Sequence, residues 1–213
     1  MYLSVPNRLT HIAAIAAVGT NVHRRLSRHN APYDAIRNWS NHYKMRREMQ
    51  FAKAFQYKKW ANEELLHLGE QQLSELSESD ALFFIRILNH TAVVDSLFIS
   101  RILGEPEKYS GDNTEETPTI SELRNSMYKK DTWLIQYAKT ASDDDLKRVI
   151  SFKFVDGDSG QLSVEEIFIH LLTHGSNHRG MASRVLAASN LERPKDTFTR
   201  FLHQMEPSRR IGV

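Results

Sequence analysis

Three histidines lie at positions where they could share one metal ion. His174 and His178 are four residues apart, a spacing that puts both side chains on one face of a helix. His90 interrupts another apolar stripe, three residues after Ile87 and four before Val94. An imidazole that is buried without partners for its ring nitrogens lowers stability. Three such rings from two helices therefore predict a shared partner, and a divalent cation is the natural one.

The other histidines have simpler interpretations. A single histidine in an apolar stripe is more often a hydrogen-bonded core residue than a ligand, so the metal hypothesis depends on all three together. His170 continues the four-residue ladder but lies about 60° from the centre of the stripe. We interpret it as a flanking residue that supports the ligands. His67 and His203 fall near predicted helix ends and are expected at the surface.

The composition narrows the chemistry. The 213 residues include no cysteine, which excludes a disulfide scaffold, a Cys-ligated zinc or iron–sulfur site and a catalytic protein thiol. Three neutral nitrogen ligands leave open positions on an ion, which is typical of catalytic sites, and histidine suits zinc, nickel, iron and manganese alike. A net charge of +2 gives little reason to expect a nucleic-acid partner. No run of about 18 apolar residues is present, so we expect no membrane-spanning helix.

Helices must position these residues, and apolar periodicity predicts four long helices and a short one. Capping boxes mark two of the starts, at Thr119 with Glu122 and at Ser163 with Glu166. The β-branched and aromatic stretch 149–155, followed by turn residues, predicts a short hairpin or extended excursion before the last long helix. The predicted helices cover residues 50–72, 80–103, 119–141, 163–189 and 197–205.

The sequence divides near Met45 into two compositions. Residues 1–47 carry eight Lys or Arg and a single acid without sustained periodicity, so we expect a basic, flexible extension. The alternatives are a translation start at Met45 or Met49, an organellar transit peptide, a secretory signal and a nucleic-acid-binding arm. Residues 48–207 form the predicted all-α domain, a four-helix bundle, and residues 208–213 a C-terminal tail.

Three segments of the chain resemble the DinB family. They are residues 57–62 (YKKWAN), residues 88–90 (LNH) and residues 174–180 (HGSNHRG). The resemblance spans about residues 50–205. It implies a four-helix bundle in up-down-down-up order that often pairs as a homodimer. It also implies a divalent metal held by three histidines, which correspond to His90, His174 and His178.

The motif around the last two histidines also shows one departure from the family. Arg179 and Gly180 match, and we interpret them as an ion pair that holds helix ends and a site of close backbone packing. The family usually continues with Gln, whereas this chain has Met181. A polar group near the site is therefore missing.

The resemblance implies two kinds of function. The first is a metal-dependent enzyme, a thiol S-transferase or a hydrolase, whose ion activates a coordinated thiol or water. Because the protein has no cysteine, the thiol would come from a low-molecular-weight cosubstrate. The second is a non-enzymatic metal-binding protein of the same fold, damage-inducible as the family name implies. A metal-free bundle with a polar core is a third possibility.

Two further expectations concern catalysis and location. Asp95, Glu165 and Glu166 lie near the histidines in sequence, but spacing puts none of them firmly on an interior face as a general base. We expect a cytoplasmic protein that acts on a small molecule, with organellar targeting left open by the basic N-terminus.

The first predicted helix carries large apolar side chains on more than one face. Phe55, Tyr57, Trp60 and Leu66 exceed what a single core stripe needs. Exposed aromatic faces commonly mark interfaces, and two-fold dimers are the commonest closed assembly. We therefore expect a homodimer, with a wider pocket lining as the other use of these side chains.

Overall fold

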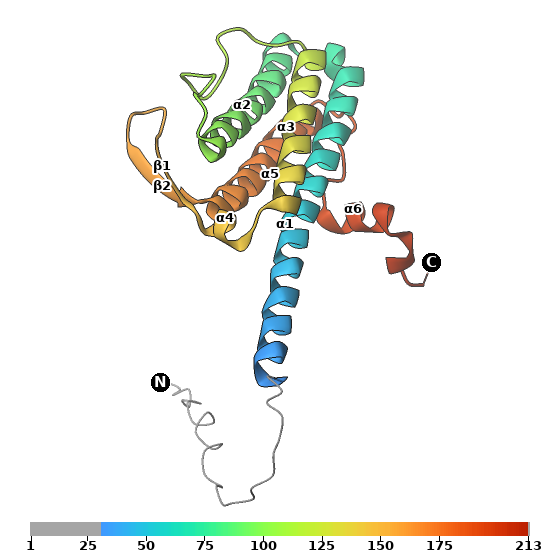
Figure 1. The fold of residues 1–213 in the computed structure, drawn as a ribbon. Helices are drawn as coiled ribbons and strands as arrows, with labels where there is room; N and C mark the ends of the chain where they lie inside the picture. The colour runs from blue at the N-terminus through green and yellow to red at the C-terminus, as the bar shows by residue number, and fades with distance from the viewer. Residues whose placement is uncertain (1–30, 213) are drawn as a thin grey trace, which may run out of the picture. The chain divides into compact units, whose positions relative to one another are not determined.

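The computed structural model describes the backbone of residues 31–212 and the side chains of residues 50–212 (Figure 1). Residues 1–30 of the predicted extension lie outside the described residues. The contacts divide the chain into Met1–Asn38 and Trp39–Val213, and the description that follows concerns the second unit by itself.

Helix α1 (Ala31–Gln72) begins earlier than the predicted start at Gln50. The residues between the two starts include good helix formers such as alanine, arginine and methionine, with Pro32 near the helix start, where proline is tolerated. Their apolar residues at helical spacing, Ile36, Trp39 and Tyr43, form only a short stripe, so periodicity alone does not predict a helix there. The helical backbone of residues 31–47 therefore corrects the prediction of a stretch without regular structure.

The described part of the chain is mostly helical, as predicted, with one small two-stranded sheet. The long helices α1, α2, α3 and α5 pack side by side (Figure 1). The remaining elements are short and connect or flank them. After α1 the order is the 3₁₀ turn η1 (Leu73–Glu75), α2 (Glu78–Leu103), α3 (Ile120–Thr140), α4 (Asp143–Lys147), β1 (Val149–Lys153), β2 (Ser159–Ser163), α5 (Val164–Ala188), α6 (Phe198–Met205) and the 3₁₀ turn η2 (Pro207–Arg209).

Local capping explains where these helices begin. The predicted boxes at Thr119 and Ser163 are both formed and start α3 and α5. Helix α2 is capped by Ser77, whose hydroxyl accepts the Asp80 amide. A further box at Ser142 starts α4, a helix too short to show periodicity in the sequence.

The predicted hairpin is present and is joined to the core. Strands β1 and β2 pair in antiparallel register, with Ile150 opposite Leu162. Ile150 is buried among apolar residues of the helices, and Arg101 of α2 donates to the Lys153 carbonyl at 2.9 Å. The hairpin therefore covers one end of α2 and leads directly into α5, which carries two of the histidines.

Apolar residues form two separate clusters along the helices. On α3, Leu134 and Ile135 belong to the hairpin-side cluster, whereas Leu123 and Met127 belong to the other, the loop-side cluster. The same division holds on α1, α2 and α5. The hairpin-side cluster contains Ala52, Phe55, Val94, Phe98, Ile102, Leu134, Ile135, Ala138, Ala141, Leu146, Ile150, Val164, Ile167, Phe168 and Leu171. The loop-side cluster contains Leu65, Leu66, Phe84, Ile85, Leu88, Ala92, Leu123, Met127, Ala182 and Leu186.

Helix α2 contributes to both clusters and is the most apolar helix of the fold. Among the described residues it is the one helix long and apolar enough to cross a membrane, but 61% of its most apolar window is buried inside the protein. Its longest apolar runs stay far below 18 residues, because Arg86, His90 and Asp95 interrupt them. Its apolar side chains pack against the other helices.

A polar layer lies between the two apolar clusters. We use this name for five buried side chains, Lys58 and Asn62 of α1, Asp95 of α2, Asp131 of α3 and Arg179 of α5. The stretch 174–179 of α5, with its histidines, falls in the same gap between the clusters. The core is therefore divided by charge at the level where the candidate site lies.

Candidate metal centre

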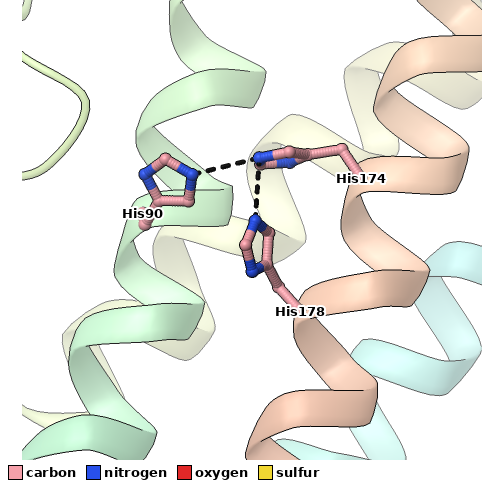
Figure 2. Close-up of side chains that lie close together, drawn as sticks. All are labelled: His90, His174 and His178. Atoms are coloured by element: carbon pink, nitrogen blue, oxygen red, sulfur yellow. Dashed lines mark hydrogen bonds between the residues drawn. The ribbon is translucent and has the colours of Figure 1, made fainter.

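The structure brings the three predicted histidines together. His90 projects from α2, and His174 and His178 project from α5, with their rings converging (Figure 2). The Nε2 atom of His174 lies 3.0 Å from Nε2 of His90 and 3.0 Å from Nε2 of His178. Within the described residues, this is the group whose donor atoms lie close enough together to share one ion.

The tautomer of His90 is fixed by the loop between α2 and α3. Its Nδ1 lies 2.7 Å from the backbone carbonyl of Asp112, and a carbonyl only accepts, so Nδ1 carries the proton. In the neutral ring Nε2 then has a free lone pair, which points at the other two histidines. The neighbouring Asn89 donates to Asn113 and Thr114 of the same loop. Sequence reasoning missed this support, because a loop carbonyl has no sequence signature.

The histidines do not satisfy one another. His174 Nε2 carries either one proton or one lone pair, so only one of its two 3.0 Å contacts can be a full hydrogen bond. The Nδ1 atoms of His174 and His178 are also buried without a partner in the described part of the chain. A cation placed among the three Nε2 atoms removes the conflict, because all three lone pairs then point to it.

Distances and protonation both fit a metal ion. Nitrogens bound at 2.0–2.1 Å with angles between tetrahedral and right-angled are about 2.8–3.4 Å apart, and the two separations of 3.0 Å from His174 Nε2 fall in that range. Burial, with the positive charges that His178, His90, His170 and Lys58 can carry, lowers the pKa of His174 to about 3. Burial also lowers the pKa of His178. Both rings are therefore neutral near pH 7, the form that binds metals.

The three rings lie at the rim of the core. All three are half-buried, and the His90 side chain is 19% exposed. The prediction placed His174 and His178 on the same buried arc as Met181, but Met181 is 39% exposed. The most buried face of α5 carries Phe168, Gly175, Ala182 and Leu186. The three rings are therefore in contact with the core on one side and with solvent on the other.

The remaining histidines lie where the sequence indicates. His170 is outside the cluster, and its ring stacks on His174 with centroids 5.2 Å apart and contacts Phe98. Burial lowers the pKa of His170 as well. His67 and His203 are exposed.

Comparison with known proteins places this site in a family. The sequence pattern of the DinB family matches residues 40–209 of the chain, which include all three histidines. The chain belongs to the DinB family. The match begins inside the stretch predicted to be an extension, in agreement with the early start of α1. No match was found among curated proteins or among solved structures.

Next to the histidines, this DinB protein buries an ionic group in the polar layer. The Lys58 ammonium donates to Asp95 Oδ2 at 2.6 Å and to Asp131 Oδ1 at 2.7 Å, and all three side chains are 1% exposed. Asn62 donates to the second oxygen of Asp131 at 2.7 Å. The second oxygen of Asp95 has no partner among the described residues.

The pKa values in the polar layer follow from burial and pairing. Burial raises the pKa of Asp95 to about 6, with Lys58 opposing and Asp131 adding to the shift. Burial alone would lower the pKa of Lys58, but the charges of Asp131 and Asp95 outweigh it and the pKa is raised. Spacing in the sequence did not put Asp95 firmly on an interior face. The structure buries it, and its partner Lys58 makes this burial possible.

Arg179 has the structural role that the sequence predicts. Its Nε donates to Asp196 Oδ2 at 2.7 Å, beyond the end of α5, and its Nη1 donates to Asn62 at 3.3 Å. Tyr57 donates to the other oxygen of Asp196, and burial together with this carboxylate raises the pKa of Tyr57 to about 12. Arg179 therefore ties the polar layer of the DinB domain to the segment that precedes α6.

The other acidic candidates lie at the start of α5. Glu166 accepts the amide and hydroxyl of Ser163 in the capping box. Glu165 also falls in the first turn. Neither belongs to the histidine cluster.

On α5 the glycine that packs closely is Gly175, and the prediction for Gly180 was wrong. A Cβ on Gly175 would lie 3.1 Å from Cε of Lys58, whereas a Cβ on Gly180 would meet nothing within 4 Å. Gly180→Ala is therefore expected to stabilise the protein by about 0.5–1 kcal/mol through helix propensity. Gly175→Ala is expected to destabilise it by about 1 kcal/mol, because Lys58 is held by two carboxylates and cannot move away freely.

Urea unfolding of both alanine variants measures this difference. The wild-type protein is the reference, and the midpoints are compared at equal slope. A more stable Gly175 variant than Gly180 variant would contradict the assignment of close packing.

Proposed function

We propose that this DinB protein binds a divalent metal through His90, His174 and His178 and acts as a metal-dependent enzyme. The observation that carries the proposal is the convergence of three Nε2 atoms that cannot all be hydrogen-bonded to one another. The fixed tautomer of His90 supports it, since the ring presents a lone pair before any ion arrives. Zinc, nickel, iron and manganese are all compatible with these ligands.

Thiol S-transfer or hydrolysis is the chemistry that the site supports best. A metal held by three neutral nitrogens supplies acidity to a coordinated thiol or water. The protein's own residues would hold the ion and orient its ligands. The backbone carbonyl of Asp112 fixes the His90 ring, and the neutral His174 and His178 supply lone pairs. The half-exposed rings leave room for a small-molecule substrate. Without cysteine in the chain, a thiol comes from a low-molecular-weight cosubstrate.

The helix packing supports a four-helix bundle in up-down-down-up order. Each apolar cluster contains residues of α1, α2, α3 and α5. A long loop, residues 104–119, connects α2 to α3, and its length allows the two helices to run in the same direction. We propose this topology for the DinB domain.

A non-enzymatic metal-binding protein is the second candidate. It is favoured by the absence of a carboxylate within the described histidine cluster, so no general base is in evidence there. The nearest acidic oxygen in contact with the cluster, Oδ2 of Asp112, lies 3.7 Å from Nδ1 of His90, the nitrogen that faces away from the other rings. Metal binding without turnover would favour this candidate.

Alanine substitution of single histidines tests the ligand set. His90→Ala, His174→Ala and His178→Ala are each expected to lose most of the bound metal, because two ligands remain. His170→Ala is the matched control and is expected to keep the wild-type stoichiometry, because its ring only stacks on His174. Elemental analysis after loading with each metal measures the result. Loss of metal in the His170 variant alone would overturn the ligand assignment.

An activity screen separates the two candidates. The metal-loaded protein is incubated with monochlorobimane and a panel of low-molecular-weight thiols, with His174→Ala as the control. An enzyme forms the thioether at a rate that depends on the metal and on His174. Full metal content with no turnover for any thiol, and no hydrolysis of ester or amide probes, would favour the non-enzymatic candidate.

Assembly, location and induction stay predictions. The aromatic argument for a homodimer is weaker than the sequence indicates, because Tyr57 and Trp60 pack against Phe198 and Phe201 of α6 in the same chain. Phe55 and Leu66 are buried in the core. Homodimerisation and damage-inducible expression are therefore proposed from the family resemblance, and cytoplasmic location stays a separate expectation.

A further inference from the structure

A large cavity lies between the second half of α5, the segment after it and α6. Its volume is about 1130 Å³, which is ample for a small molecule. On α5 it is lined by Ser176, Gly180 and Ser183. Ser176 and Gly180 each follow a metal-site histidine by two residues, so they lie about 200° around the helix from it. The cavity is thus on the side of α5 that faces away from the histidine cluster.

Positive charge dominates the lining of this cavity. Arg193, Lys195, Arg200 and Arg210 all line it, and none of them forms an ion pair within the described part of the chain. The lining contains one carboxylate, Asp196, which already accepts from Arg179 and Tyr57. Among the described side chains, the cations of the lining therefore have no anion to neutralise them.

Residues of the lining also carry hydrogen-bonding groups that the described protein leaves unused. The Nε of Arg200, a residue of the lining, is buried without a partner in the described structure, so the protein does not fully satisfy this guanidinium. The hydroxyls of Ser176 and Ser183 add further donors, whereas those of Thr197 and Thr199 are already paired with each other. Guanidinium groups match phosphate and carboxylate oxygens two at a time, so the donor set suits an anion.

Gly180 leaves room for a ligand to approach α5. No protein atom lies within 4 Å of a Cβ built there, so nothing in the described protein explains a glycine in the middle of the helix. A mid-helix glycine lowers helix stability by about 1 kcal/mol relative to alanine. The chain's own residues 1–47 are not a complementary occupant, because they carry eight basic residues and one acid.

We propose that this cavity binds a small polyanion through its phosphate or carboxylate groups. Arg200 provides a guanidinium that the protein leaves unpaired, Arg193, Lys195 and Arg210 provide the surrounding charge, and Gly180 provides the space. The site is separate from the histidine cluster and does not depend on the proposed enzymatic function.

Thermal unfolding of the full-length protein at constant ionic strength tests this binding. Inorganic phosphate and succinate are titrated separately, and a saturable rise in melting temperature with either probe is expected. A rise with phosphate alone assigns a phosphorylated ligand, and a rise with succinate alone assigns a carboxylate ligand. The titration is repeated in His174→Ala, where the same rise is expected, so binding to a metal at the histidines is distinguished from binding in the cavity.

Three variants locate the site. Arg200→Gln is expected to weaken probe binding by about tenfold, because a charge-assisted hydrogen bond is lost. Gly180→Leu keeps every charge and is expected to weaken binding by filling the space. Arg184→Gln removes an exposed charge of α5 outside the lining and is expected to bind like wild type. Absence of a saturable shift with both probes, or equal loss in the Arg184 and Arg200 variants, would overturn the proposal.

Discussion

Replacing Lys58 with Met is expected to lower the free energy of unfolding by about 3–5 kcal/mol, the usual cost of breaking a buried ion pair. The substitution keeps most of the side-chain volume but removes the cation between Asp95 and Asp131. Both carboxylates then stay buried, and one oxygen of Asp95 already lacks a partner among the described residues. The measurement is urea unfolding at pH 7 with metal content held constant.

Lys129→Met on α3 is the matched control for this variant. Lys129 is exposed, and surface substitutions change stability by within about 0.5 kcal/mol. The variant Asp95→Leu in the Lys58→Met background should recover part of the loss, because it removes the carboxylate that is poorest in partners. A Lys58 variant as stable as the Lys129 variant would show that the ion pairs do not form in solution.

The metal-free protein is expected to lose stability steadily as the pH falls from about 6.5 toward 3. The pKa of His174 is about 3 in the folded protein and about 6.5 in the unfolded chain. Between these values the unfolded chain binds more protons, so acid favours unfolding. The lowered pKa values of His170 and His178 act in the same direction. Asp95 acts in the opposite direction below about pH 6, because its pKa is raised, but it is one group against three.

Urea midpoints measured at pH 7 and pH 5 on chelator-treated protein test this dependence. The midpoint should be lower at pH 5, and the difference should shrink in His174→Gln, which has no imidazole to protonate. His67→Gln is the control, since His67 is exposed. A midpoint that rises toward pH 5 would mean that Asp95 dominates the proton balance.

Local signals in the sequence were sufficient for most elements of the fold. The capping boxes at Thr119 and Ser163 involve residues three apart, so their partners can be recognised without tertiary information. The hairpin is similar, because its strands and turn are contiguous. The histidine cluster was predictable for a related reason: two ligands share one helix, and the third interrupts an apolar stripe.

The features that the sequence did not reveal depend on partners from distant elements. In the sequence, Lys58 is a charged interruption of an apolar stripe with no visible partner. Its role becomes clear only when Asp95 and Asp131 are known to face it from two other helices. The rotation of α5 has the same origin. Its buried face is set by the close contact of Gly175 with Lys58, whereas counting apolar residues pointed to Met181. The support of His90 by a loop carbonyl depends on loop conformation alone.

The polar layer also fixes the axial register of the helices, that is, how far each helix is shifted along its axis relative to its neighbours. Apolar side chains tolerate a helix that slides by one turn, since Leu and Ile fit many similar neighbours. A slide of α1 or α2 would separate Lys58 from Asp95 and leave both charges buried among apolar residues, so only one alignment avoids that penalty. On α2, His90 lies just over one turn before Asp95. On α5, Gly175 is the residue after His174 and packs against Lys58. The buried ion pairs therefore also fix the axial positions of α2 and α5, the two helices that carry the ligands, relative to each other. The imidazoles are thus aligned before an ion binds.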